Sequence, residues 1–158
     1  MKMSSTQPTK ATLTVPLITR LYLTILEPLM CLNGVYLTLF HPSEYHSKIT
    51  RFGLASFSPE NQFLYTQLAA AWLVFGFNEA IVLWLVDDLR VWKLLCIGML
   101  LSDAVYFVSS VEAVGGWERF SAIGEWDAFD WSVFIMAVIA TLMRLVVLGV
   151  NGNKAKRA

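Results

Sequence analysis

The sequence has few charged residues. Only 15 % of its 158 residues are Asp, Glu, Lys or Arg, whereas 56 % are apolar and the mean hydropathy is +0.57. Soluble domains carry about 25 % charged and about 45–50 % apolar residues. A soluble fold of this length would need more polar surface to cover itself, while a lipid-facing surface needs none. The composition therefore favours one membrane-embedded domain.

An excess of positive charge is also absent, since 12 Lys and Arg balance 12 Asp and Glu. A nucleic-acid-binding domain needs a basic stripe to neutralise phosphates, so we expect no nucleic-acid partner. Cysteine is scarce as well. Cys31 and Cys96 both fall within apolar runs, which favours buried thiols over a disulfide, and no Cys/His pattern predicts a zinc site.

A cleavable signal peptide is not predicted, because residues 1–15 form a polar tail and the apolar run after them is too long for a signal core. Four segments approach the roughly 20 apolar residues that cross a bilayer. They are residues 16–40, 63–86, 92–111 and 131–150, joined by loops at 41–62, 87–91 and 112–130 and followed by a basic tail at 151–158. The sequence thus predicts an all-α fold, a four-transmembrane-helix bundle.

The Lys and Arg residues outside these spans or at their ends indicate the orientation. One side would hold seven of them: Lys2, Lys10, Arg90, Lys93, Lys154, Lys156 and Arg157. The other side would hold three: Lys48, Arg51 and Arg119. Because positive residues favour the cytoplasmic side, we expect both N and C termini in the cytoplasm. The small loops and the lack of a cleavable signal suit the endoplasmic reticulum membrane.

Five charged residues lie inside the predicted spans, away from the span ends: Arg20, Glu27, Glu79, Asp103 and Arg144. Each costs roughly 2.5–3.5 kcal/mol at a helix centre, so they should pair or line a wet cavity. Counted at about 1.5 Å per residue, all five lie between the midplane and the cytoplasmic face. We therefore expect one polar site that opens toward the cytoplasmic leaflet. Structural ion pairing is the alternative, but two arginines do not balance three acids.

Two local features accompany these charges. Pro28 lacks the N–H that would bond to the Thr24 carbonyl, which predicts a kink beside Glu27, although such kinks are common in membrane helices. His41 and His46 lie in the first loop, where solvated side chains are expected rather than a metal site. The sequence predicts neither a metal nor a cofactor.

Carboxyl groups that share a low-dielectric pocket do not all ionise, so one can act as a general acid while an arginine-paired one acts as a base. Trp72, Phe75 and Tyr106 would supply aromatic walls near a developing cation. Apolar or epoxidised molecules partition into the bilayer and would reach such a site from the side. The expected partners are therefore a lipophilic small-molecule substrate and membrane lipid.

The chain resembles a group of small fungal four-helix membrane proteins. The resemblance covers nearly the whole chain after residue 15. It is carried by Pro16-Leu17, Arg20, Glu27-Pro28, Gly34, Gln67-Leu68, Glu79-Ala80, Asp88 to Trp92, Asp103, Trp126 to Trp131, Arg144 and Gly149. Similar proteins of polyene-pyrone polyketide pathways, of the aurovertin and citreoviridin type, are epoxide hydrolases or cyclases that open polyene epoxides.

This resemblance implies an epoxide hydrolase or cyclase that needs no cofactor. The implied catalytic residues are Glu27, Asp103, Glu79 and Arg144, and the expected substrate-binding residues are Arg20, Trp72, Phe75 and Asn78. A histidine often follows the family's aspartate by three positions, where this chain has Tyr106. Either Tyr106 is the proton donor here, or the chemistry differs.

Two other functions stay open. The same acids would serve a lipid or sterol isomerase similar to the emopamil-binding type, which uses no water. A non-catalytic protein that binds lipid or assembles with other pathway enzymes, or with a second copy of itself, is the third hypothesis.

Overall fold

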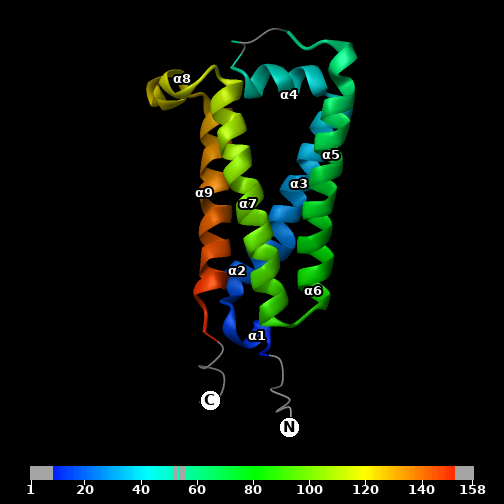
Figure 1. The fold of residues 1–158 in the computed structure, drawn as a ribbon, viewed down its shortest axis with the longest axis vertical. Coiled ribbons are helices and arrows are strands. Elements are labelled where there is room, and N and C mark those ends of the chain that lie inside the picture. Colours follow the sequence, from blue (N-terminus) through cyan, green and yellow to red (C-terminus); the bar gives the residue numbers. More distant parts are fainter. Residues whose placement is uncertain (1–8, 52, 54–55, 152–158) are drawn as a thin grey trace, which may run out of the picture.

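The computed structural model describes residues 9–51, 53 and 56–151, and within these residues every regular element is a helix. Four helical stretches are long and apolar enough to cross a membrane: Leu17–Phe40, Pro59–Leu85, Leu89–Ala113 and Ala128–Gly149. They stand side by side as an up-and-down bundle (Figure 1). The predicted four-span fold is confirmed, and the chain is a membrane protein.

The two N-terminal spans are composite, whereas the other two are single helices. The first span joins α2 (Leu17–Leu21), the π-helical η1 (Tyr22–Leu26) and α3 (Glu27–Phe40). The second joins η2 (Pro59–Asn61), α5 (Gln62–Phe77), the π-helical η3 (Asn78–Val82) and α6 (Leu83–Leu85). The third and fourth are α7 (Leu89–Ala113) and α9 (Ala128–Gly149).

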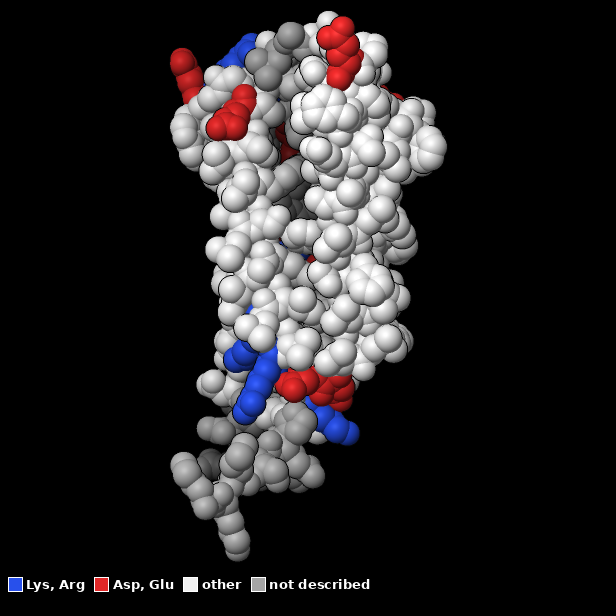
Figure 2. All heavy atoms as spheres, turned by 45° about the vertical axis from the view of Figure 1, so that its right-hand side comes forward, with Lys and Arg blue, Asp and Glu red and all other residues white. Residues whose placement is uncertain are grey.

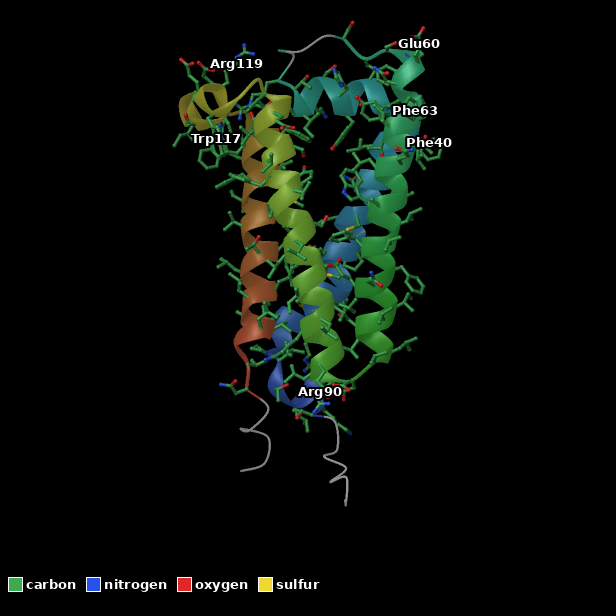
Figure 3. All side chains as sticks on the ribbon, viewed as in Figure 1. Phe40, Glu60, Phe63, Arg90, Trp117 and Arg119 are labelled. Carbon is green, nitrogen blue, oxygen red and sulfur yellow. The ribbon has the colours of Figure 1, made fainter. Side chains whose placement is uncertain are left out.

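The surface of the bundle matches a lipid environment. Large apolar side chains such as Leu17, Leu101 and Val105 are at least 60 % exposed. On the face drawn in Figure 2, charged residues gather at the two ends and an uncharged band lies between them. In Figure 3, Phe40 and Phe63 likewise point away from the bundle.

The expectation of loops at 41–62 and 112–130 was incomplete. Helix α4 (Pro42–Ile49) crosses the end of the bundle opposite the described chain ends (Figure 1). Proline suits the first helical position because its missing N–H would have no partner there, and Glu44 pairs with Lys48 one turn later at 2.7 Å. The second segment contains α8 (Trp117–Ser121) and η4 (Ile123–Glu125). These helices are too short and too polar to give a membrane-span signal.

Two glycines let α3 and α5 approach closely, as small residues commonly do between membrane helices. A Cβ at Gly34 would overlap the ring of Trp72. At Gly76, a Cβ would lie 3.5 Å from the Cβ of Cys31 and 3.9 Å from the Pro28 carbonyl oxygen. This close packing brings the middle of the first span against the second.

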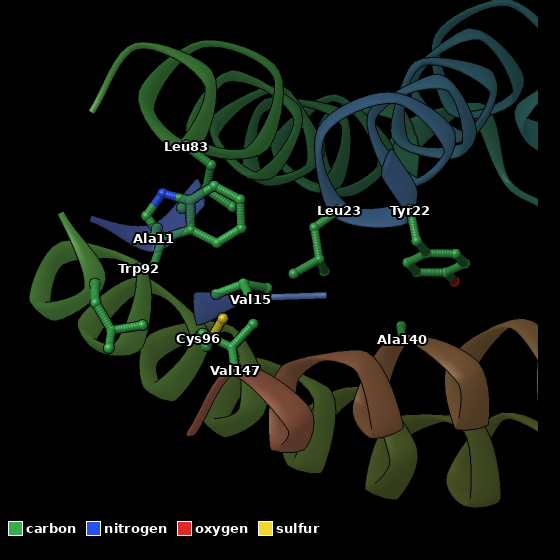
Figure 4. Close-up of a cluster of buried hydrophobic side chains, with 10 residues drawn as sticks. Ala11, Val15, Tyr22, Leu23, Leu83, Trp92, Cys96, Ala140 and Val147 are labelled. Carbon is green, nitrogen blue, oxygen red and sulfur yellow. The ribbon is translucent and has the colours of Figure 1, made fainter. Parts of the chain in front are cut away.

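The end of the bundle that holds the described chain ends is tied together and filled. Helix α1 (Ala11–Thr14) is anchored through Thr12, whose amide and hydroxyl each donate to the Asp87 carboxylate at 2.8 Å. An apolar cluster closes the interior above it (Figure 4). Its buried members include Ala11, Val15, Leu23, Leu83, Trp92, Cys96 and Val147. Cys31 and Cys96 are free thiols, as predicted, but only Cys96 is fully buried and Cys31 is partly exposed.

Candidate functional site

One arginine gathers three carboxyl groups inside the bundle. Arg144 donates through Nη1 to Asp103, and through Nη2 to Glu27 and, at 3.1 Å, to Glu79. Each of the four transmembrane spans contributes one of these residues. In the chain, Arg144 is 41 positions from Asp103, 117 from Glu27 and 65 from Glu79. We call these four residues the Arg144 cluster.

The direction of helical side chains explains why they converge. Counted from the end that holds the described chain ends, Glu79 and Arg144 lie about 8–9 Å along their spans, Glu27 about 15 Å and Asp103 about 21 Å. A helical side chain leans toward the N-terminus of its own helix. Glu79 and Arg144 therefore lean away from the described chain ends, because their spans run toward that end of the bundle. Glu27 and Asp103 lean toward that end, because their spans run away from it.

Both glutamates adjoin π-helical turns. Glu79 lies within η3, and Glu27 directly follows η1, with its N–H bonded to the carbonyl of Tyr22. The residue after Glu27 is Pro28, so the backbone change expected from this proline takes the form of a widened turn before it. Single π-helical turns occur frequently at functional sites because they re-aim a side chain out of the regular helical register.

Burial divides the cluster into an inner and an outer part. Glu79 is 0 %, Arg144 1 % and Glu27 6 % exposed, whereas the Asp103 side chain is 30 % exposed. The carboxyl groups of Glu27 and Glu79 lie beside each other, and the Oε2 atom of each is buried without a hydrogen-bond partner. One proton placed on this pair would give it a hydrogen bond and would reduce the excess of three acids over one cation.

A cavity of about 420 Å³ lies between α7 and α9, and Asp103 belongs to its wall. Its lining is largely apolar and includes Phe107, Phe134 and Ala137. From Asp103 it extends toward Arg51 and Asp130, at the end where α4 and α8 lie. The site was expected to open toward the side of the chain termini. That prediction is wrong, because the apolar cluster fills that end.

The outer end of the cavity carries a second ion pair, which sequence reasoning missed. Arg51 Nε lies 2.9 Å from Asp130 Oδ1, and Arg51 Nη1 donates to the Arg119 carbonyl. The guanidinium also lies 5.6 Å from the centre of the Trp126 ring. Arg51 and Asp130 are 79 positions apart in loop and helix-start segments, so no spacing pattern could have paired them.

Tyr106 lies one turn beyond Asp103 on α7 and belongs to the cavity wall. Next to it is Tyr45 of α4, whose hydroxyl is buried without a hydrogen-bond partner. Burial raises the pKa of Tyr45, so this phenol stays neutral. Helix α4 thus packs its one buried residue against the wall of the cavity.

Of the four expected substrate-binding residues, two lie near the Arg144 cluster and two do not. Phe75 lies near the cluster, with its ring centre 6.0 Å from Arg144 Cζ, and Asn78 begins the π-helical turn that carries Glu79. Trp72 instead packs against Gly34 and, edge to face, against Tyr45. Arg20 stays outside the cluster. It forms no ion pair within the described residues, and its Nε is buried without a partner.

The two histidines contact tyrosines, His41 with Tyr36 at 3.1 Å and His46 with Tyr65 at 2.7 Å. In the described part of the chain, no group of three or more His, Cys, Asp or Glu side chains could hold a metal ion. The three acids of the Arg144 cluster surround a guanidinium instead.

Comparison with known proteins gives one match. The chain matches, over residues 12–153, the family described as a domain of unknown function, DUF7704, and it belongs to that family. The matched region contains all four spans and the whole Arg144 cluster. No curated protein and no solved structure matches the chain.

Proposed function

We propose that this member of the DUF7704 family is a membrane-embedded enzyme that opens a lipophilic epoxide by general acid–base catalysis, as a hydrolase or a cyclase. The observation that carries the proposal is the position of Asp103. It is held by a buried arginine on one side and lines a largely apolar cavity on the other. Carboxyl groups held inside a membrane are costly and mark functional sites by default.

The proposed reaction uses two residues of the cavity wall. Asp103, ionised because Arg144 pairs with it, accepts a proton from a water molecule as the water oxygen attacks an epoxide carbon. The carbon–oxygen bond breaks, and the Tyr106 hydroxyl donates its proton to the departing oxygen. The product is a diol, and the proton on Asp103 then returns to Tyr106. In a cyclase, a hydroxyl of the substrate replaces the water.

Glu27 and Glu79 are positioning residues in this scheme, because they are buried behind Arg144. They fix its guanidinium so that Nη1 points at Asp103. A proton held between the two glutamates would leave Asp103 as the ionised partner of Arg144. Residues that orient a catalytic group in this way are worth keeping even where they cost stability.

The setting of the enzyme is part of the proposal. The resemblance to proteins of fungal polyene-pyrone pathways supports a polyene epoxide as substrate. The Lys and Arg distribution supports both termini in the cytoplasm, and the small loops suit the endoplasmic reticulum membrane. Association with a second copy, or with enzymes that make the epoxide, would shorten the path of an insoluble intermediate.

Mass spectrometry of products tests the function. Membranes containing the protein are given lipophilic mono- and bis-epoxides in ¹⁸O-labelled water, with membranes lacking the protein as control. One labelled oxygen per diol supports the hydrolase, and an unlabelled cyclic ether supports the cyclase. If no epoxide is converted in a panel that spans short, long and polyene chains, the proposal is contradicted.

The largely apolar lining of the cavity also favours a second candidate, isomerisation of a lipid without water. A carboxylic acid would protonate a double bond and a carboxylate would remove a proton elsewhere. This reaction gives an unlabelled product of unchanged mass, so the same measurement with unsaturated lipids distinguishes the two functions.

A further inference from the structure

The cavity has polar groups at both ends and apolar walls between them. Asp103 lies at the inner end and the Arg51–Asp130 pair at the outer end. The lining runs from Leu100 of α7 to Val114, the residue after it, and the part from Asp103 to Val114 corresponds to about 16 Å of helix. A ligand that satisfies both ends must therefore be long, apolar in its body and polar at its head.

Access to this cavity is blocked at one end of the bundle. At the end that holds the described chain ends, α1, α2 and the segment between them insert buried residues, including Ala11, Val15 and Thr19. The Asp87–Thr12 and Leu89–Thr9 hydrogen bonds hold that segment in place. At the opposite end, the lining of the cavity reaches Ile49 of α4 and Phe120 of α8. The face drawn in Figure 2 is hollowed in its upper part, with acidic atoms visible in the depth of the hollow. A ligand would reach Asp103 from the α4 and α8 end.

The Arg51–Asp130 pair determines which head group fits. Two N–H groups of Arg51 are used, by Asp130 and the Arg119 carbonyl, out of five that a guanidinium carries. Both Asp130 oxygens already accept a bond, one from Arg51 and one from the Asp127 amide. An anionic head would face the Asp130 carboxylate and a cationic head would face the guanidinium, and each repulsion is strong in partly buried surroundings. An uncharged acceptor, such as a hydroxyl or carbonyl oxygen, meets the remaining N–H donors without repulsion.

We infer that the ligand of this cavity is an elongated uncharged amphiphile, whose hydroxyl or carbonyl head binds at the Arg51–Asp130 pair. Its apolar body lies between α7 and α9 and reaches Asp103. This inference rests on the proposed function only where it places a reacting epoxide at Asp103. If that function holds, the epoxide of the substrate lies at the end of the molecule opposite its polar head.

Photocrosslinking tests the inference on the full chain in lipid vesicles. Three probes share one long alkyl chain with a diazirine and differ only in the head: an alcohol, a sulfate ester and a trimethylammonium. The alcohol should label peptides of α7 and α9 about tenfold more than either charged probe, the difference expected from one unfavourable charge contact. Equal or stronger labelling by a charged probe overturns the inference.

Two substitutions localise the labelling. Ala137→Phe fills the middle of the cavity and should abolish labelling near Asp103 by the alcohol. Ala71→Phe adds the same side chain at an exposed position of α5 and should leave labelling unchanged. Labelling that survives Ala137→Phe places the probe elsewhere and also overturns the inference. Labelling needs no turnover, so a negative epoxide assay would contradict the proposed function and leave the inference about the ligand standing. Epoxide hydrolysis without labelling by the alcohol would contradict the inference alone.

Discussion

Arg144 of α9 donates a hydrogen bond to Asp103 of α7 at the inner end of the cavity, although 41 positions separate them in the chain. The same guanidinium holds Glu27 and Glu79 on its buried side. One side chain therefore links all four spans and also presents a carboxylate to the cavity. The structural and the proposed chemical roles of the cluster meet in this residue, and its substitution should affect both.

Replacing Arg144 by methionine should destabilise the protein by about 3–5 kcal/mol, because the buried Glu27 and Glu79 and the partly buried Asp103 would lose the one cation that pairs with them among the described residues. Thermal unfolding in detergent measures the loss, with Arg90→Gln at the exposed end of α7 as the control. Adding Glu27→Gln and Glu79→Gln to the methionine variant should restore part of the stability, since fewer acids are then left unpaired. A methionine variant as stable as the control would show that the cluster contributes nothing to the fold.

Gly34→Ala should destabilise the bundle by about 1–3 kcal/mol, the usual cost of overpacking, because the new methyl group overlaps the Trp72 ring. Gly98→Ala is the matched control. Nothing lies within 4 Å of its Cβ position, and alanine favours a helix by up to about 1 kcal/mol. Thermal unfolding of the two variants should therefore shift in opposite directions, and equal shifts would contradict the close α3–α5 contact.

The anchor of α1 should weaken in acid. Partial burial raises the pKa of Asp87, but the hydrogen bonds from the Thr12 amide and hydroxyl outweigh it, so the pKa lies below its usual value. The stabilisation is then fully present above the unfolded-state pKa of about 3.9 and is lost as the pH falls through the folded-state value. Hydrogen exchange at the Thr12 amide, corrected for its intrinsic pH dependence, should be faster in Asp87→Asn than in the wild type at neutral pH. The two proteins should converge in strong acid. Equal protection at neutral pH would rule out this anchor.

Much of the fold could be predicted from the sequence, because lipid imposes a simple rule on it. A span needs about 20 apolar residues, and this requirement located all four helices. Charges within those spans must face inward, which correctly brought Glu27, Glu79, Asp103 and Arg144 together. Helix α4 was missed because its polar residues follow no membrane rule.

Three details of the site could not be predicted from the spacing of residues in the sequence. Arg20 shares a helix face with Glu27, yet it remains outside the cluster, because Arg144 alone reaches all three acids. The direction of the cavity depended on how α1 fills one end of the bundle, which only tertiary packing determines. The Arg51–Asp130 pair joins two segments whose meeting required the whole fold.

Tyr106→Phe tests the proposed proton donor. Loss of general acid catalysis should lower the turnover of a lipophilic epoxide about 10²–10⁴-fold, while the apolar wall of the cavity is kept. Epoxides whose leaving oxygen is a weaker base should lose less, because they need less help from an acid. Tyr36→Phe, the same change at an exposed position outside the cavity, serves as control. An unchanged rate in Tyr106→Phe would remove this residue from the reaction.

The most direct test of the central claim is to compare Asp103→Asn with Glu112→Gln in epoxide turnover and thermal unfolding, measured on the same preparations. Both changes replace a carboxylate of α7 by its amide, but Glu112 is exposed and lies outside the cluster and the cavity. The proposed function predicts that Asp103→Asn remains folded in the membrane and loses turnover at least about 10²-fold, while Glu112→Gln keeps it. Equal turnover in the two variants would contradict the claim that Asp103 is the catalytic base.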